Sequence, residues 1–209
     1  MVDPRPVIGT DSRPRCSWGI EPPDYVEYHD LEWGRPPESD HQFFETVCLE
    51  GFQAGLSWMT ILRKRPRFRQ VFAGFEPSFV SALRDSDVQR LMGDRGIIRN
   101  EKKIRSAINN AQRAIELIDE FGSLSNYFGG FAESNPPPKE IPAKTETSAR
   151  LARDLRKRGW TFVGPTTMYA FMQSTGLVND HIAGCWVRDT VEALRRNSYP
   201  IATGSEKPS

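Results

Sequence analysis

The chain has 209 residues, of which 38% are hydrophobic and 26% are charged. This composition is typical of a folded globular protein with a sizeable core, and it excludes a disordered or fibrous chain. The formal net charge is only +1, so the overall charge of the chain gives no indication of nucleic-acid binding.

The cysteines and the N-terminus indicate the compartment. There are three cysteines, Cys16, Cys48 and Cys185, and an odd number argues against a disulfide framework. No apolar run reaches the roughly 20 residues of a membrane span, and the N-terminus lacks the apolar core of a secretory signal. We therefore expect a cytoplasmic protein with no membrane partner.

Helical periodicity dominates the chain from residue 41 onward. Apolar spacing, caps and breakers predict helices over residues 41–54, 57–62, 68–72, 77–83, 87–92, 100–121, 147–158, 166–175 and 189–196. Asp40 is the expected N-cap of the first. The clearest helix, 100–121, has an apolar stripe formed by Ile104, Ala107, Ile108, Ala111, Ile115 and Ile118. Gly122 is expected to end it.

Irregular segments separate and flank these helices. The sequence PPPKEIP predicts a loop over residues 135–145, and residues 160–163 are the only strand candidate. We expect a flexible N-terminal tail over 1–15, one helical domain over 16–188 and a partly disordered C-terminal extension over 189–209. The predicted fold class is all-α.

Four side chains from the two ends of the chain form a candidate metal site. His181 and Cys185 are four residues apart, so on a helix they would share a face. Cys16 and His29 lie near the other end. Two thiolates and two imidazoles suit a tetrahedral structural zinc that joins the N- and C-terminal segments. The alternative is that each is a core residue, as we expect for Cys48.

A glutamate and five aromatic residues form a second candidate site. Glu50 shares the core-facing side of its helix with Phe43 and Val47, where a carboxylate is costly unless a cation pairs with it. The nearby aromatic residues are Trp18, Tyr25, Tyr28, Trp33 and Trp58. Aromatic rings around one carboxylate can bind a flat organic cation. Alternatively, Glu50 pairs with a distant arginine or caps a helix, and the rings are core.

Basic residues gather in three clusters that could bind phosphates. They are Arg63, Lys64, Arg65, Arg67 and Arg69; Arg95, Arg99, Lys102, Lys103 and Arg105; and Arg150, Arg153, Arg156, Lys157 and Arg158. The second cluster surrounds a short helix, a tight turn at Gly96 and a long helix. This pattern predicts a helix-hairpin-helix, with Arg99, Lys102 and Lys103 beside a bound phosphate. The alternative for each cluster is a solvated helix face.

Several segments together resemble the DNA-3-methyladenine glycosylase I family. They are YHDLEWG (28–34), CLEGFQAGLSW (48–58), GIIRNEKKI (96–104), KRGWTFVGPTTMYAFMQ (157–173) and GLVNDHIAGC (176–185). The resemblance extends from about residue 16 to residue 185. It implies a helix-hairpin-helix glycosylase fold, monofunctional hydrolysis of the N-glycosidic bond of 3-methyladenine, and one structural Zn²⁺ per chain on Cys16, His29, His181 and Cys185.

The resemblance also implies roles for individual residues. Its base-recognition positions fall on Glu50, Tyr28, Tyr25, Trp33, Trp58 and Trp18, and its wedge falls on Leu56. We expect Glu50 and Tyr28 to bind the base, with Trp58 and Trp33 stacking against it. Leu56, beside Gly55 at a helix junction, suits an apolar wedge that replaces a flipped base. The expected partner is double-stranded DNA with alkylated bases, bound by a monomer.

Two features depart from this pattern. No aspartate matches the essential one that follows the hairpin in other branches of the superfamily, since Asp119 lies on the long helix. Phe52 stands where family members carry a polar residue, a change expected to affect the site's rim or DNA contact. The alternatives are a non-catalytic protein that binds alkylated bases, a helical interaction protein without a DNA role, and a zinc hydrolase, which four protein ligands disfavour.

Overall fold

The computed structural model describes residues 5–201, and these are mostly helical. The described part contains ten α-helices and one two-stranded hairpin. The all-α class that the sequence predicts is therefore confirmed except for this hairpin. The chain divides into two compact units that are described separately below. Unit 1 comprises Met1–Pro36, Phe128–Ala143 and Met172–Ser209, and unit 2 comprises Pro37–Tyr127 and Lys144–Phe171.

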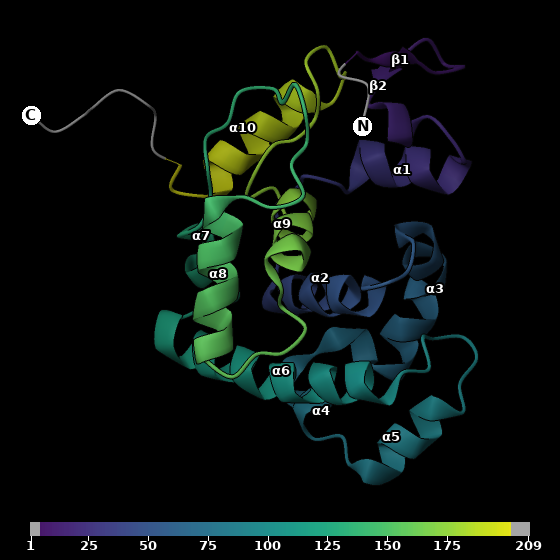
Figure 1. Cartoon of the computed structure of the whole chain (residues 1–209), viewed down its shortest axis with the longest axis vertical. Coiled ribbons are helices and arrows are strands. Elements are labelled where there is room, and N and C mark those ends of the chain that lie inside the picture. The colour runs from purple at the N-terminus through teal and green to yellow at the C-terminus, as the bar shows by residue number, and fades with distance from the viewer. Residues whose placement is uncertain (1–4, 202–209) are drawn as a thin grey trace, which may run out of the picture. The chain divides into compact units, whose positions relative to one another are not determined.

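Unit 2 is built around one long helix, α6 (Glu101–Phe121), against which α2, α4 and α5 pack (Figure 1). Its other elements are α2 (Asp40–Gln53), α3 (Trp58–Val71), η2 (Ala73–Phe75), α4 (Pro77–Ser81), α5 (Asp85–Met92) and α8 (Glu146–Lys157). Helices α7 (Leu124–Gly129) and α9 (Pro165–Ser174) begin in unit 2, and the unit boundaries fall inside them.

Helix α6 begins and ends where the sequence predicts. The side chain of Asn100 accepts a hydrogen bond from Lys103 N at 3.2 Å, and Gly122 has the left-handed conformation of a helix C-cap. Its buried face is shifted from the predicted stripe, because it includes Lys103 and Asn110. Ile108 is only half-buried. Two polar residues therefore lie on a face that periodicity assigns to apolar ones.

Unit 1 contains a hairpin and two helices in its described part. Strands β1 (Val7–Ile8) and β2 (Pro14–Arg15) pair antiparallel, and η1 (Ser17–Gly19), α1 (Pro23–Leu31) and α10 (Arg188–Ser198) complete the unit. The N-terminal segment expected to be flexible therefore has a defined hairpin from residue 7 onward. Arg195 of α10 is fully buried and donates hydrogen bonds to the carbonyls of Glu133 and Leu177. The other tail residues, 1–4 and 202–209, lie outside the described part.

Helix α3 differs from the two short helices predicted for its residues. One helix of 14 residues runs from Trp58 to Val71 and contains Pro66. Proline interrupts the helical hydrogen bonding, which is why the sequence suggests a break. Burial of Ile61 and Leu62 before the proline, and of Phe68 after it, holds both halves on one side of a continuous helix.

The single strand candidate, residues 160–163, was wrong, because this segment contains no strand. Thr161 N donates to Asn110 Oδ1 at 2.9 Å, and Asn110 Nδ2 donates to Thr161 O at 2.9 Å. A buried amide side chain thus satisfies the backbone groups that a neighbouring strand would satisfy.

Phe52 is a core residue. It is 1% exposed, and its ring lies 4.6 Å from that of Phe68. The expected effect of Phe52 on a rim or on DNA contact is therefore not supported, since aromatic packing accounts for its presence.

None of the helices within residues 5–201 has both the length and the apolar character that crossing a bilayer requires.

Candidate functional site

The four predicted metal ligands lie together in unit 1. Cys16 directly precedes η1, and His29 lies in the last turn of α1. His181 and Cys185 lie between α9 and α10. All four residues are buried, and their candidate ligand atoms lie within 4.8 Å of one another.

Three of the distances between donor atoms are those that a tetrahedral metal site requires. Cys185 Sγ lies 3.5 Å from His29 Nε2 and 3.6 Å from His181 Nδ1. Cys16 Sγ lies 3.8 Å from His181 Nδ1. Atoms bound to zinc at about 2.0–2.3 Å in a tetrahedron lie roughly 3.3–3.8 Å apart. The residues present therefore fit a metal ion.

The placement of His181 and Cys185 on one helix was wrong. Residues 175–187 form turns and irregular structure. Gly184 has a φ of +80°, and Cys185 N donates to Ile182 O at 3.1 Å. The chain therefore turns back between the two ligands. This turn, and not a helix, brings their side chains together.

The surroundings of His181 and Cys185 favour metal binding. Burial holds the pKa of His181 below its ordinary value, which leaves a neutral imidazole with a free lone pair. A hydrogen bond from Cys16 lowers the pKa of Cys185, and the same contact raises the pKa of Cys16. One sulfur is therefore readily ionised, as a metal-binding thiolate must be.

Asp30 organises a shell of hydrogen bonds around His29. Its carboxylate lies 2.8 Å from His29 Nδ1 and accepts from Trp186 Nε1 at 3.1 Å. Arg15 donates to both Asp30 oxygens, at 2.8 and 2.6 Å, and to both oxygens of Asp11 at 2.7 Å. With Nδ1 bonded to Asp30, His29 keeps Nε2 for the cluster. Asp30 follows His29 directly, which is the only sequence signal for this role.

The aromatic residues predicted from the N-terminal segment meet around Trp18. Its ring centroid lies 4.9 Å from that of Trp33, 5.9 Å from that of Tyr25 and 6.3 Å from that of Tyr28. The Trp33 ring also lies 4.6 Å from the ring of His181. These four residues therefore form one aromatic group that borders the metal cluster.

Unit 2 holds the predicted carboxylate. Glu50 lies on α2 and is 4% exposed, as its spacing from Phe43 and Val47 predicts. The other acidic residue of the segment, Glu45, forms an ion pair with Arg69 at 2.8 Å. Trp58 is the first residue of α3 and is half-buried.

The turn between α2 and α3 presents the predicted wedge. Gly55 has a φ of +81°, and Leu56 is 42% exposed. Leu56 N donates to Gln53 O at 2.6 Å, and Ser57 caps α3 by accepting a hydrogen bond from Thr60 N. A left-handed glycine followed by an exposed leucine thus lies between two helix ends.

Helices α5 and α6 form the predicted hairpin, and its turn is braced from α3. Gly96 N donates to Asp94 Oδ1 at 2.8 Å, and Arg67 Nε donates to Asp94 Oδ2 at 2.8 Å. A Cβ on Gly96 would lie 2.5 Å from Arg67 Cγ, so glycine permits this close approach. Arg99 and Lys102 are exposed beside the turn.

Several other members of the basic clusters are engaged within the protein. Arg67, Arg69, Arg105 and Arg158 form ion pairs with acidic side chains. Lys103 is buried and its Nζ donates to backbone carbonyls, so its predicted place beside a phosphate was wrong. Its position on the buried face of α6, four residues before Ala107, is the signal that could have identified it.

Comparisons with known proteins agree with these features. Residues 18–189 match the family model described as methyladenine glycosylase. The chain is 43% identical over 177 residues to DNA-3-methyladenine glycosylase 1 of Escherichia coli (strain K12), covering 82% of this chain and 95% of that protein. It is 39% identical to DNA-3-methyladenine glycosylase of Haemophilus influenzae, covering 82% of this chain and 96% of that protein.

Solved structures give the same result. A crystal structure of 3-methyladenine DNA glycosylase I is similar with a TM-score of 0.78 and 42% identity, covering 82% of this chain and 98% of that chain. A structure of the enzyme from Staphylococcus aureus, whose subject is the structural basis of 3-methyladenine recognition, gives a TM-score of 0.78 at 30% identity. The match covers 83% of this chain and 96% of that chain. The family match spans most of the chain, and these relatives are matched almost end to end. The chain therefore belongs to the methyladenine glycosylase family.

Proposed function

We propose that this protein is a DNA-3-methyladenine glycosylase, which hydrolyses the N-glycosidic bond of 3-methyladenine in DNA. The observation that carries the proposal is the buried carboxylate of Glu50 on α2, in a chain that matches glycosylase relatives over nearly their whole length. A carboxylate out of water binds a cation more strongly than it binds a neutral base.

The proposed chemistry depends on the charge of the substrate. A 3-methylated adenine is already cationic, so it leaves the sugar without needing a proton from the enzyme. The protein must instead bind and orient the base. We assign hydrogen bonding and charge pairing with the base to Glu50, and a hydrogen bond to Tyr28. Stacking and cation–π contact would come from Trp18, Tyr25, Trp33 and Trp58.

DNA engagement would rest on the elements of unit 2. The base must leave the duplex before its glycosidic bond is accessible, and the exposed Leu56, next to Gly55, would fill the gap. Backbone N–H groups at the Gly96 turn would bind a phosphate, with Arg99 and Lys102 adding charge. We propose that a monomer acts on double-stranded DNA in this way.

The metal is proposed to be one structural Zn²⁺ per chain. Cys16, His29, His181 and Cys185 supply four donors, the complete set for a closed tetrahedral site. A site without an open position binds no substrate or water, so we propose a mechanical role for the ion. It would hold in place the segment that carries Trp18, Tyr25, Tyr28 and Trp33.

A base-release assay tests the proposal. Purified protein is incubated with DNA treated with an N-methylating agent, and the released bases are separated by chromatography. We expect free 3-methyladenine to appear in proportion to enzyme and time. Binding to methylated DNA without release at high protein concentration would support the non-catalytic alternative and contradict an enzyme. Testing 3-methylguanine and 7-methylguanine in the same DNA would define the range of bases.

A further inference from the structure

Lys102 and Lys103 are adjacent in the sequence but lie in different environments. Lys102 is exposed, whereas Lys103 is 7% exposed on the buried side of α6. Burial lowers the pKa of the Lys103 ammonium from its ordinary value. An ammonium group in such a place is costly unless it is fully engaged, so its contacts indicate what it does.

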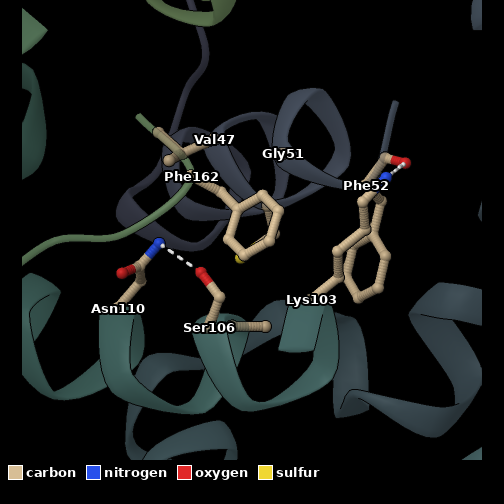
Figure 2. A pocket seen from close by; sticks show the side chains of 9 residues that line it. Val47, Gly51, Phe52, Lys103, Ser106, Asn110 and Phe162 are labelled. Carbon is tan, nitrogen blue, oxygen red and sulfur yellow. Dashed lines mark hydrogen bonds between the residues drawn. The ribbon is translucent and has the colours of Figure 1, made fainter. Parts of the chain in front are cut away.

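Those contacts are with the end of α2. Lys103 Nζ donates to the carbonyl of Phe52 at 2.8 Å and to the carbonyl of Ala54 at 2.6 Å, and Figure 2 shows its side chain reaching from α6 to Phe52. The last carbonyls of a helix lack partners within the helix and carry its partial negative charge. A lysine from another helix thus supplies the C-terminal cap of α2.

The cavity beside Lys103 is small. A cavity of about 10 Å³, room for roughly one water molecule, is lined by Val47, Gly51, Lys103, Ser106 and Phe162, among others (Figure 2). To reach a DNA phosphate, Lys103 would have to leave its hydrogen bonds to the carbonyls of Phe52 and Ala54.

The capped end of α2 leads directly into the turn with the wedge. Only Gly55 separates Ala54, whose carbonyl binds Lys103, from the exposed Leu56. Gly55 has nothing within 4 Å of the position a Cβ would occupy, so packing at that residue does not fix the turn. On the other side, Ser57 caps α3. The path of Leu56 therefore depends on its own hydrogen bond to the Gln53 carbonyl and on the two helix caps that flank it.

We propose that Lys103 is a positioning residue for base excision, which holds the turn between α2 and α3 so that Leu56 can enter the duplex. The proposal rests on the proposed function, because it needs Leu56 to act as a wedge. It gives two neighbouring lysines of the hairpin different tasks. Lys102 faces DNA, and Lys103 connects the hairpin helix to the wedge.

The test compares release of 3-methyladenine from duplex DNA with release from single-stranded DNA of the same sequence. Single-stranded DNA has no stacked pair to wedge apart, so a wedge defect affects the duplex only. We expect Lys103→Met to lower the duplex rate about tenfold, the effect of losing roughly 1.4 kcal/mol of charge-assisted hydrogen bonding. The single-stranded rate should stay within about twofold. Equal losses on both substrates would overturn the proposal.

Two further variants separate this role from a general loss of structure. Lys103→Arg retains the cation and its donors, and we expect it to restore most of the ratio between duplex and single-stranded rates. Lys103→Met combined with Leu56→Ala should be no slower on duplex than Leu56→Ala alone, because both changes disable the same wedge. Additive losses would contradict the proposal. If Lys103→Met does not fold, as judged by circular dichroism, Lys103→Gln replaces it in both comparisons.

Lys102→Met is the matched control, since it removes the same charge one residue away. We expect it to weaken DNA binding and to reduce the slope of log affinity against log salt by about 0.9. Lys103→Met should leave that slope unchanged, and a reduced slope would place Lys103 on DNA after all. A wild-type protein that releases no base contradicts the proposed function itself, whereas wild-type release with an unaltered Lys103→Met ratio contradicts only the positioning role.

Discussion

Arg15 and Asp30 form a buried ion pair beside the candidate metal cluster. Each is nearly inaccessible to solvent, and Arg15 donates two hydrogen bonds to the Asp30 carboxylate. The pair orients His29, so the metal cluster depends on a residue that is not itself a ligand.

We predict that Asp30→Asn weakens metal binding about 10- to 100-fold, the usual effect of removing such a partner of a ligand histidine. The amide cannot carry the charge that holds both His29 and Arg15. Competition with a chromogenic chelator measures the affinity. Asp11→Asn is the matched control, because Asp11 bonds Arg15 through both oxygens but is not bonded to His29. Equal metal affinities in Asp30→Asn and wild type would show that the hydrogen bonds of Asp30 do not support the metal site.

A tyrosine–carboxylate pair provides a test that depends on pH. Tyr127 OH donates to Asp154 Oδ2 at 2.7 Å, and Arg158 Nε donates to the same oxygen at 2.9 Å. Burial acts to raise the pKa of Asp154, but these two hydrogen bonds and the charges of Arg158 and Lys157 together outweigh it and hold the pKa below its ordinary value of 3.8. The bonds therefore add stability above pH 3.8, which is lost as the pH falls through the lower folded pKa.

We expect Tyr127→Phe to lower the free energy of unfolding at pH 7 by about 1 kcal/mol. The difference from wild type should shrink below pH 3.8, where Asp154 protonates first in the unfolded chain. Urea unfolding at a series of pH values measures both. A difference that is constant from pH 7 to pH 3 would show that the hydroxyl acts through packing alone.

At the scale of elements, the hairpin of α5 and α6 is held by contacts to α3. Asp94 connects the amide of Gly96 to the guanidinium of Arg67, and Lys64 Nζ donates to the carbonyl of Arg95 at 2.8 Å. Two basic residues of α3, Lys64 and Arg67, therefore brace the turn at Gly96 from within the protein, a role that composition does not reveal.

We predict that Gly96→Ala weakens binding to undamaged duplex DNA about fivefold, roughly 1 kcal/mol. Its Cβ would collide with the side chain of Arg67, and relief of the collision disturbs the Asp94 bridge. Fluorescence anisotropy with a labelled duplex measures the affinity. The control is Gly93→Ala in the same hairpin, where the added Cβ would meet only the Arg90 carbonyl at 3.3 Å. Unchanged affinity in Gly96→Ala would remove this turn from the DNA interface.

Local periodicity predicts most of the helices, although it misses α1 and α7, and it predicts their partners poorly. Helix α6 has the predicted ends because Asn100 and Gly122 act within its own sequence. The stretch at 160–163 resembles a strand, yet a buried Asn110 from α6 satisfies its backbone. Lys103 resembles a surface lysine in the sequence, but it is buried against the end of α2. In both wrong predictions, the residue that forms the hydrogen bond lies about fifty positions away in the sequence.

At the scale of the molecule, the candidate metal centre joins chain segments that are far apart in sequence. Cys16 and Cys185 are separated by most of the chain, and both are buried with His29 and His181. The sequence predicts this ligand set because Cys and His are few. It does not predict the irregular path of residues 175–187, since the turn at Gly184 has no periodic signal.

Removal of the metal should destabilise unit 1. A metal that binds the folded site and not the unfolded chain stabilises the folded state by its binding free energy. For a contribution of about 3 kcal/mol, we expect the melting temperature to fall by roughly 10 °C, because each kcal/mol shifts it about 2–4 °C in a chain of this size. Calorimetry before and after chelation measures this. Purified protein that contains far less than one equivalent of zinc would contradict the site.

The most direct measurement is the rate of 3-methyladenine release from methylated duplex DNA by wild type, Glu50→Gln and Glu45→Gln. Both glutamates are buried on α2, and Glu45 has its own ion pair with Arg69, so Glu45→Gln controls for the loss of a buried carboxylate. If Glu50 binds the cationic base, Glu50→Gln should lose about 100-fold, roughly 2.7 kcal/mol of transition-state stabilisation. Glu45→Gln should stay within about threefold. Release by Glu50→Gln at the wild-type rate would contradict the account.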